Sequence, residues 1–305
     1  EPLFRSSLSF FSFFIVIPAF LYFALDRENI DIDEFRLNSG YQEVKLSAGI
    51  TSYKDIGDKN NKVIVLVHGA TFGSLAYEEY VNVFLNNNYR VITYDQYGRG
   101  YSDRVRNNVS IELMEQQLRE LIEHCEVEDV ILYGVSFGAA VVAKYASNNL
   151  KNISFIGYQV PLINSANVPL LSIVKIPLYG DLLVRGFLVP GVLERIDEYE
   201  DLMGKKLLDH YIGQFDVKGT ENFFKEFFLG NAMGNRLYDH NIIGSNFIPS
   251  YFAYAEDDME IDSKLIEEAI KNYSNPIVKK YSGGHFFSTG IERKIAQEFI
   301  DSIKK

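Results

Sequence analysis

Ser136 stands at the centre of the pentapeptide Gly-Val-Ser-Phe-Gly, with Gly134 and Gly138 two residues before and after it. The apolar run 130–135 is typical of a buried strand, and the residues that follow the pentapeptide are typical of a helix. A sharp turn from strand to helix leaves no room for side chains at the two glycines, and it strains the central residue. The serine hydroxyl would then stand above the sheet edge, where it could act as a nucleophile. The backbone N–H of Phe137, at the start of the helix, would point to where an oxyanion forms.

A serine hydroxyl is a poor nucleophile until a neutral imidazole removes its proton, and a carboxylate must hold that imidazole in the right tautomer. The C-terminal part of the chain offers both groups, each after an apolar run typical of a strand. Asp257 and Asp258 follow the run 247–255, and His285 follows the run 276–281. These residue types suit acyl transfer through a covalent intermediate on the serine.

These motifs resemble those of the α/β-hydrolase family, whose nucleophile lies in a G-x-S-x-G turn. Three further stretches support the resemblance: His-Gly-Ala at 68–70, a D-x-x-G-x-G-x-S loop at 95–102, and a G-x-H-F loop at 283–286. The resemblance covers residues 43–304 and keeps the family's chain order of serine, acid and histidine. It implies a mostly parallel α/β sheet and a reaction that needs no metal or organic cofactor.

The resemblance also implies a role for each residue of the site. In the family the acid lies in a G-x-x-D turn, and this alignment puts Ala255 at the glycine and Asp258 at the acid. The change from glycine to alanine leaves Asp257 as a competitor. The implied catalytic residues are Ser136, Asp258 and His285, with the backbone N–H groups of Ala70 and Phe137 as the oxyanion hole.

Other polar residues in the matched motifs are expected to be structural. The resemblance gives His68 a role in stabilising its turn and not in proton transfer. Asp95 and Arg99 are expected to fix the loop 95–102, whose glycines allow a tight course near the site. A catalytic role for Asp95 is the alternative.

Composition excludes several classes of function. The net charge of −11 argues against a nucleic-acid partner. Cys125 is the only cysteine, so the chain can form neither an internal disulfide nor a cysteine-based metal site. We predict no cofactor and no metal ligands.

Residues 6–25 form a run of 20 residues without a charge, long enough to cross a bilayer as a helix. A cleaved signal peptide is the alternative, but no good A-x-A cleavage site precedes Asp26. We predict an uncleaved transmembrane helix at 6–25, a membrane-anchored localisation, and contact with the membrane through this helix. Arg5 on one flank, against the net negative flank 26–28, predicts an extracytoplasmic catalytic domain.

The remaining chain divides by its hydrophobic pattern. A connector at 26–42 leads to an α/β-hydrolase core at 43–162 and 245–305. The segment 163–244 interrupts the alternation of strands and helices and is rich in Leu, Ile, Phe and Tyr. Because the family commonly inserts a helical cap here, we expect this segment to be a lid and an acyl-binding wall.

Together these features predict a serine hydrolase that cleaves carboxylic esters through an acyl-enzyme. The anchor and the apolar cap favour lipid-like acyl esters, as in capped esterases and monoacylglycerol lipases. One alternative is hydrolysis of a carbon–carbon bond on the same triad. The other is a non-catalytic binding protein with this fold.

Overall fold

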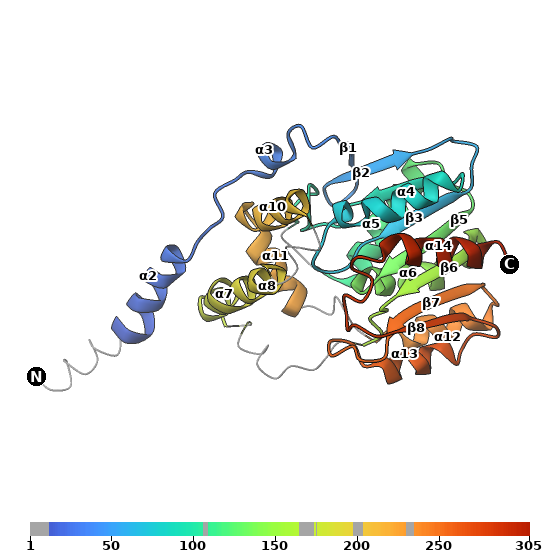
Figure 1. Ribbon diagram of the computed structural model, residues 1–305. Helices are drawn as coiled ribbons and strands as arrows, with labels where there is room; N and C mark the ends of the chain where they lie inside the picture. The colour runs from blue at the N-terminus through green and yellow to red at the C-terminus, as the bar shows by residue number, and fades with distance from the viewer. Residues whose placement is uncertain (1–11, 106–108, 165–173, 175, 198–203, 230–234) are drawn as a thin grey trace, which may run out of the picture.

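The computed structural model describes residues 12–105, 109–164, 174, 176–197, 204–229 and 235–305. Its centre is an eight-stranded sheet with the order β1-β2-β4-β3-β5-β6-β7-β8 (Figure 1). The pairs β1–β2 and β2–β4 are antiparallel, and all other neighbouring strands are parallel. The strands are β1 (Gln42–Lys45), β2 (Ile50–Ile56), β3 (Val63–Val67), β4 (Arg90–Tyr94), β5 (Val130–Val135), β6 (Ile153–Gln159), β7 (Ser250–Ala255) and β8 (Ile277–Tyr281). The prediction of a mostly parallel α/β sheet is confirmed.

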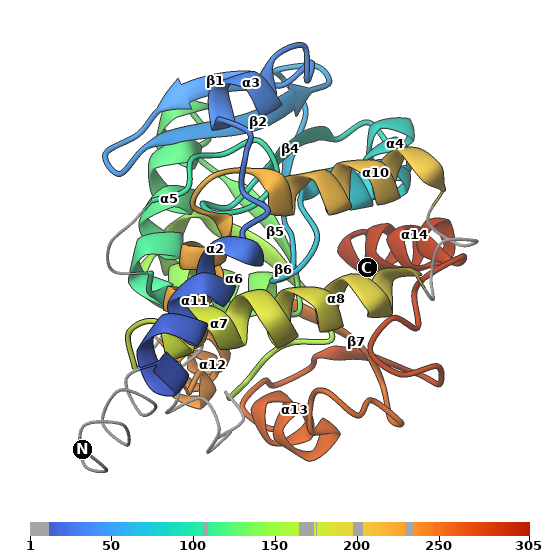
Figure 2. The same cartoon turned by 90° about the vertical axis from the view of Figure 1, so that its left-hand side faces the viewer.

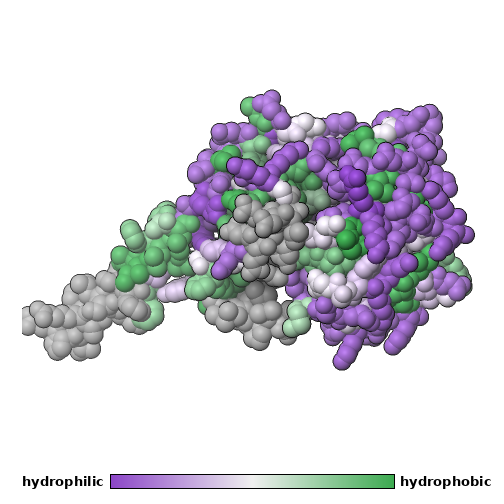
Figure 3. Space-filling view, in the orientation of Figure 1, coloured by the Kyte–Doolittle hydropathy of each residue, from purple (hydrophilic) through white to green (hydrophobic). Residues whose placement is uncertain are grey.

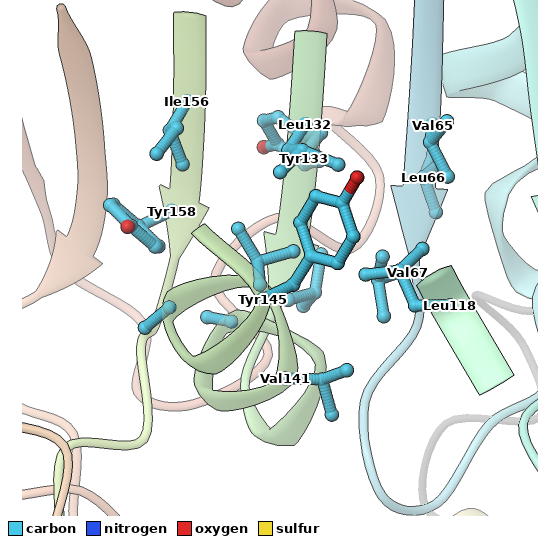
Figure 4. Packing of buried hydrophobic residues seen from close by; sticks show 14 of the residues in the cluster. Val65, Leu66, Val67, Leu118, Leu132, Tyr133, Val141, Tyr145, Ile156 and Tyr158 are labelled. Carbon is cyan, nitrogen blue, oxygen red and sulfur yellow. The ribbon is translucent and has the colours of Figure 1, made fainter. Parts of the chain in front are cut away.

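The central strands are mostly apolar because both faces of the sheet are covered. Every residue of β3, β5 and β7 is buried. Figure 4 shows Val65 of β3, Leu132 of β5 and Ile156 of β6 level with one another on neighbouring strands, with Val141 and Tyr145 of the neighbouring helix beside them. The sheet and this helix therefore share one hydrophobic core.

Successive side chains of a strand point to opposite faces of the sheet. The residues of β5 show which helices cover each face. The ring of Tyr133 lies 6.2 Å from Phe84 of α4 (Glu78–Asn86) and 4.6 Å from Phe299 of α14 (Glu292–Ile303). The next residue, Gly134, faces α6 (Phe137–Asn148), which packs against α5 (Ile111–His124) and α12 (Leu237–Ser245). In turn, α13 (Ser263–Ile270) lies against α12 and β7. Helices thus cover both faces of the sheet.

A helical segment lies between β6 and β7. Its described elements before α12 are α7 (Tyr179–Leu183), η5 (Val184–Leu188), α8 (Val189–Asp197), α10 (Lys205–Gly213), η6 (Gln214–Asp216) and α11 (Thr220–Leu229). They gather on one side of the sheet (Figures 1 and 2) and have a small core of their own, built around Tyr211, Phe215 and Phe224. Part of the predicted cap, 165–173, 175, 198–203 and 230–234, falls outside the described residues. The role of this segment as a lid stays a prediction.

The N-terminal transmembrane anchor is not supported. In the part of the chain that the structure describes, no helix has both the length and the apolar character needed to span a bilayer. The described helical stretch of the predicted anchor runs from Ser12 through η1 (Ser12–Val16) and α2 (Ile17–Ala24). Residues 6–11 lie outside the described residues. The predicted membrane-anchored localisation is contradicted, and the membrane contact that depended on the anchor loses its support.

The end of this stretch is packed against the helical segment. Arg185 of η5 donates a hydrogen bond to Tyr22 O, and its guanidinium lies 4.1 Å from the centre of the Tyr22 ring. The apolar surface of α2 is visible where it leaves the more polar body of the protein (Figure 3). An apolar run alone does not reveal such contacts, because the residues that bind its end are far away in the sequence.

Carboxylates gather around Arg185 just after α2. Its guanidinium forms ion pairs with Asp26 at 3.3 Å and with Glu221 of α11 at 2.5 Å. Glu28 accepts hydrogen bonds from the backbone N–H groups of Gly219 and Glu221. Burial, together with the charge of Glu28, raises the pKa of Glu221 to about 7. This carboxyl therefore gains a proton in the folded state at a pH where the unfolded chain has lost it.

We expect the protein to lose stability as pH rises from about 5 to 8, and Glu221→Gln to reduce that loss. A carboxyl whose pKa is higher in the folded protein than in the unfolded chain stabilises the fold. This stabilisation is complete below the unfolded pKa and is lost as pH rises through the folded pKa. A rise from 4.5 to about 7, at about 1.4 kcal/mol per unit, sets an upper limit of about 3.5 kcal/mol. Thermal melts across this pH range measure the effect, with Glu226→Gln on the same helix as the control. A pH profile of Glu221→Gln identical to that of the wild type would contradict it.

Candidate active site

The turn from β5 to α6 places Ser136 in a strained conformation. Its backbone has φ 52° and ψ −117°, at the position that precedes the first helical residue. Residues other than glycine rarely adopt positive φ, and such strain costs about 1–3 kcal/mol. A Cβ on Gly138 would lie 2.2 Å from Val67 O, and one on Gly134 would lie 2.7 Å from the Cα of Ala139. Both glycines are therefore required for this close approach of helix and strands.

Backbone hydrogen bonds hold the strained turn in place. Ser136 N donates to Gln159 O at the end of β6, at 2.9 Å. Ser136 O accepts from the N–H groups of Ala139 at 3.0 Å and Leu162 at 3.2 Å. The serine is thus tied to its own helix and to the next strand, and its side chain is left half-buried.

His285 lies beside Asp258, which follows β7. His285 Nδ1 and Asp258 Oδ2 are 2.9 Å apart, and the Asp258 side chain is fully buried. The other carboxylate oxygen accepts from the N–H groups of Glu260 at 2.7 Å and Ile261 at 3.1 Å. Burial alone would raise the pKa of Asp258, but these hydrogen bonds, that of His285 foremost, outweigh it and lower the pKa below its usual value. Asp258 is therefore a carboxylate at neutral pH and can orient the imidazole.

Asp257 has different partners. Its exposed carboxylate accepts hydrogen bonds at 3.0 Å from the N–H groups of Gly283 and Gly284. These bonds lower its pKa. Asp257 thus holds the loop that leads to His285, whereas Asp258 contacts the imidazole itself.

Ser136, His285 and Ala70 line one cavity of about 490 Å³. Its apolar walls are Phe72, Leu75, Ala76, Val135, Val160, Leu207 and Phe286. Its charged lining residues, all exposed or half-buried, are Glu78, Glu79, Lys205, Lys206 and Glu292. The residues predicted from three separate motifs therefore share one space, which is lined by both apolar and charged residues.

The turn after β3 is fixed by His68. Gln96 N donates to His68 Nε2 at 2.8 Å, so the ring proton is assigned to Nδ1, which donates to Gly69 O at 2.7 Å. Burial lowers the pKa of His68 to about 4, so the ring is neutral at pH 7. Because the peptide group is planar, fixing Gly69 O also fixes the direction of the Ala70 N–H. His68 has the contacts of a structural residue.

The glycine-containing loop after β4 is held by Asp95. Its buried carboxylate accepts from the N–H and hydroxyl of Ser74 at 2.7 and 2.8 Å, and from Tyr101 N at 2.9 Å. Arg99 of the same loop donates a hydrogen bond to Ala70 O. Both residues therefore tie this loop to the turn that carries Ala70.

Sequence reasoning missed the polar group beneath the cavity. Gln159 lines the cavity and is buried, and its Oε1 accepts from the hydroxyls of Tyr80 at 2.8 Å and Tyr133 at 2.6 Å. Its Nε2 donates to Ser288 Oγ at 2.9 Å. The one available signal was a glutamine at the end of an apolar strand. Its partners come from three other segments, which no local pattern connects.

Three carboxylates outside the cavity come close enough together to hold a cation. The ligand atoms of Asp26, Glu28 and Glu221 lie within 4.8 Å of one another. Arg185 already forms ion pairs with two of them, and none of the three lines the cavity. This cluster is therefore an ion-pair network that joins the N-terminal segment to α11.

This chain resembles known proteins both in sequence and in fold. Residues 58–170 match the family model described as serine aminopeptidase, S33. A putative non-heme chloroperoxidase of Synechocystis is 33% identical over 93 residues, which cover 30% of this chain and 33% of that protein. The chain thus spans about a third of the length of this curated relative.

Solved structures resemble nearly the whole chain at low identity. An alpha/beta hydrolase enzyme, MGS-M2 from a deep-sea metagenome library, has a TM-score of 0.72 at 14% identity, covering 87% of this chain and 98% of its own. The enol-lactonase from Burkholderia xenovorans has a TM-score of 0.73 at 13% identity, covering 87% of this chain and all of its own. At such identities the likeness establishes the fold.

The different partners of the two aspartates predict different effects of substitution. Asp258→Asn should lower the turnover of an activated ester about ten-thousand-fold, because an amide stabilises the wrong imidazole tautomer. Asp257→Asn only weakens hydrogen bonds at an exposed loop, so turnover should fall less than about tenfold, by analogy with other exposed contacts. Steady-state kinetics of the two variants measure this, and a larger loss in Asp257→Asn would reverse the assignment.

Proposed function

Because this chain has the α/β-hydrolase fold, we propose that it is a serine hydrolase that cleaves carboxylic esters with Ser136 as nucleophile. The observation that carries the proposal is the 2.9 Å contact of His285 Nδ1 with Asp258, in a cavity that His285 shares with Ser136. A histidine oriented through Nδ1 leaves Nε2 as the proton acceptor. The strained turn at Ser136 and the helix that begins after it add support.

The reaction follows from these groups. As the Ser136 hydroxyl attacks the ester carbonyl, its proton passes to His285, and the carbonyl oxygen becomes an oxyanion. The N–H groups of Ala70 and Phe137 stabilise this oxyanion, and Asp258 stabilises the imidazolium. His285 then gives its proton to the departing alcohol, which leaves an acyl-enzyme. A water molecule, deprotonated by His285, releases the carboxylic acid by the same steps and restores the serine.

The cavity supports a division of the substrate into two parts. The acyl group would lie against the apolar wall that includes Leu75, Val160 and Phe286, where each buried methylene favours binding. The alcohol part would contact charged lining residues such as Glu78 and Lys206. We therefore extend the proposal to esters with a lipid-like acyl group and a polar alcohol part.

Covalent labelling tests the nucleophile. A fluorophosphonate probe should label the wild-type protein, and Ser136→Ala should abolish both labelling and ester hydrolysis. The loss in turnover should be about a million-fold, because the members of such a triad act as a unit. Ser147→Ala, on the same helix, serves as the control and should keep its label. Labelling that persists in Ser136→Ala would exclude this serine as the nucleophile. A wild-type protein that takes no label would favour a non-catalytic role.

A panel of p-nitrophenyl esters from acetate to laurate tests the acyl site. We expect kcat/KM to rise about fourfold for each methylene added, since each buried methylene contributes about 0.8 kcal/mol, until the cavity is filled. A profile that falls from acetate onwards would rule out the lipid-like acyl group. Esters that are all inert, while the probe still labels Ser136, would favour a carbon–carbon bond hydrolase on the same residues.

A further inference from the structure

Helix α11 is linked to both backbone segments that would bind the oxyanion. The ring of Phe227 packs edge-on against Phe137, with 4.8 Å between the ring centres. The guanidinium of Arg99 lies under the same helix, 4.1 Å from the ring of Phe224, 4.9 Å from that of Phe223 and 5.4 Å from that of Phe227. Arg99 in turn bonds Ala70 O. One helical face therefore reaches Phe137 directly and Ala70 through an arginine.

Arg99 is an unusual residue to bury in this place. Its side chain is almost wholly inaccessible, and among the described residues no carboxylate forms a salt bridge with it. Burial lowers its pKa to about 9, so the group still carries its charge at pH 7. Its hydrogen bonds go to carbonyl oxygens, those of Ala70 and, at 3.2 Å, Gly98. A charge buried without a counterion is costly, so its aromatic and carbonyl contacts must compensate for the lost solvation.

We propose that Arg99 is a positioning residue for the oxyanion hole, and that the aromatic face of α11 acts on catalysis by holding Arg99 in place. This inference rests on the proposed serine hydrolase function. It gives the helical segment a role at the reacting atoms that is separate from covering the cavity.

Peptide geometry explains how Arg99 acts. His68 fixes Gly69 O and thereby the peptide plane that carries the Ala70 N–H. Arg99 fixes the next plane through Ala70 O. With both planes held, Ala70 cannot rotate its N–H away from the cavity. If Arg99 is removed, only one of the two planes remains held.

The helix is anchored to the loop that carries Arg99. Arg104 Nε donates to Thr220 Oγ1 at the start of α11, at 3.0 Å, and Gly100 N donates to Gln214 Oε1 at 3.2 Å. A Cβ on Gly98 would lie 2.1 Å from the ring of Phe223, so only glycine lets the helix approach this closely. Among the described residues that line the cavity, none belongs to α11. This helix therefore supports the site from behind.

The first test compares two buried arginines. Arg99→Met should lower kcat for a p-nitrophenyl ester about 10- to 100-fold, with KM changed less than about threefold, because a displaced donor acts mainly in the transition state. Arg90→Met is the control. Arg90 is also buried, but its guanidinium bonds the carboxylate of Asp55 and the carbonyl oxygen of Cys125, and none of these bonds goes to Ala70 or α11. The kcat of this control variant should stay within about threefold of the wild type, even if its melting temperature falls as much as that of Arg99→Met.

Two further variants keep the test decisive if Arg99→Met does not fold. Arg99→Lys keeps the charge and can still donate to Ala70 O, so it should recover part of kcat. Phe227→Leu should lower kcat with little change in KM, whereas Phe215→Leu should not. Phe215 stacks on Phe224 within the segment's own core and is the matched aromatic control. Equal losses of kcat in Arg99→Met and its arginine control, or in Phe227→Leu and Phe215→Leu, would overturn the proposal. A change in KM alone would also overturn it.

A second readout does not depend on activity. Hydrogen–deuterium exchange, followed by mass spectrometry of a peptide that covers 68–74, should become faster in Arg99→Met and stay unchanged in Arg90→Met. Unchanged exchange in both variants would overturn the positioning role. A wild type without esterase activity would contradict the proposed function alone, since the exchange result would still decide whether Arg99 holds this turn.

Discussion

The strained backbone of Ser136 is the constraint on which the site depends. A positive φ at a residue other than glycine persists only where the surroundings leave no alternative. Here Gly138 lets α6 lie against the carbonyl of Val67, and Gly134 lets the same helix lie against β5. The hydrogen bond from Ser136 N to β6 completes the turn. A larger side chain at either glycine would have to move the helix, and with it the N–H of Phe137 and the serine hydroxyl.

The parallel sheet brings the other groups to the same place. Ala70 follows β3, Ser136 follows β5, Asp258 follows β7 and His285 follows β8. The carboxyl ends of parallel strands meet at one edge, so residues more than two hundred positions apart in the chain come to share one cavity. Buried polar groups then fix each turn at that edge, with His68 and Asp95 as the clearest cases. The helical segment between β6 and β7 is joined to this arrangement through the buried guanidinium of Arg99.

A feature could be predicted from the sequence where the residues that form it lie close together in the chain. The buried strands and the pentapeptide at Ser136 are local patterns, and the resemblance to a known family placed Asp258 where the structure brings it beside His285. The transmembrane prediction for 6–25 was wrong because hydrophobicity says nothing about distant partners such as Arg185, which binds Tyr22. The hydrogen bonds of Gln159 and the aromatic contacts of Arg99 were missed for the same reason. Each joins segments that are far apart in the chain.

The central claim is that one serine and two backbone N–H groups, fixed by these contacts, form the reacting centre. A crystal structure of the wild-type protein after inactivation with a fluorophosphonate measures this directly. We expect phosphorus bound to Ser136 Oγ, with one phosphonyl oxygen about 2.7–3.1 Å from the backbone nitrogens of both Ala70 and Phe137. An adduct on another residue, or a phosphonyl oxygen that points away from these two N–H groups, would contradict the account.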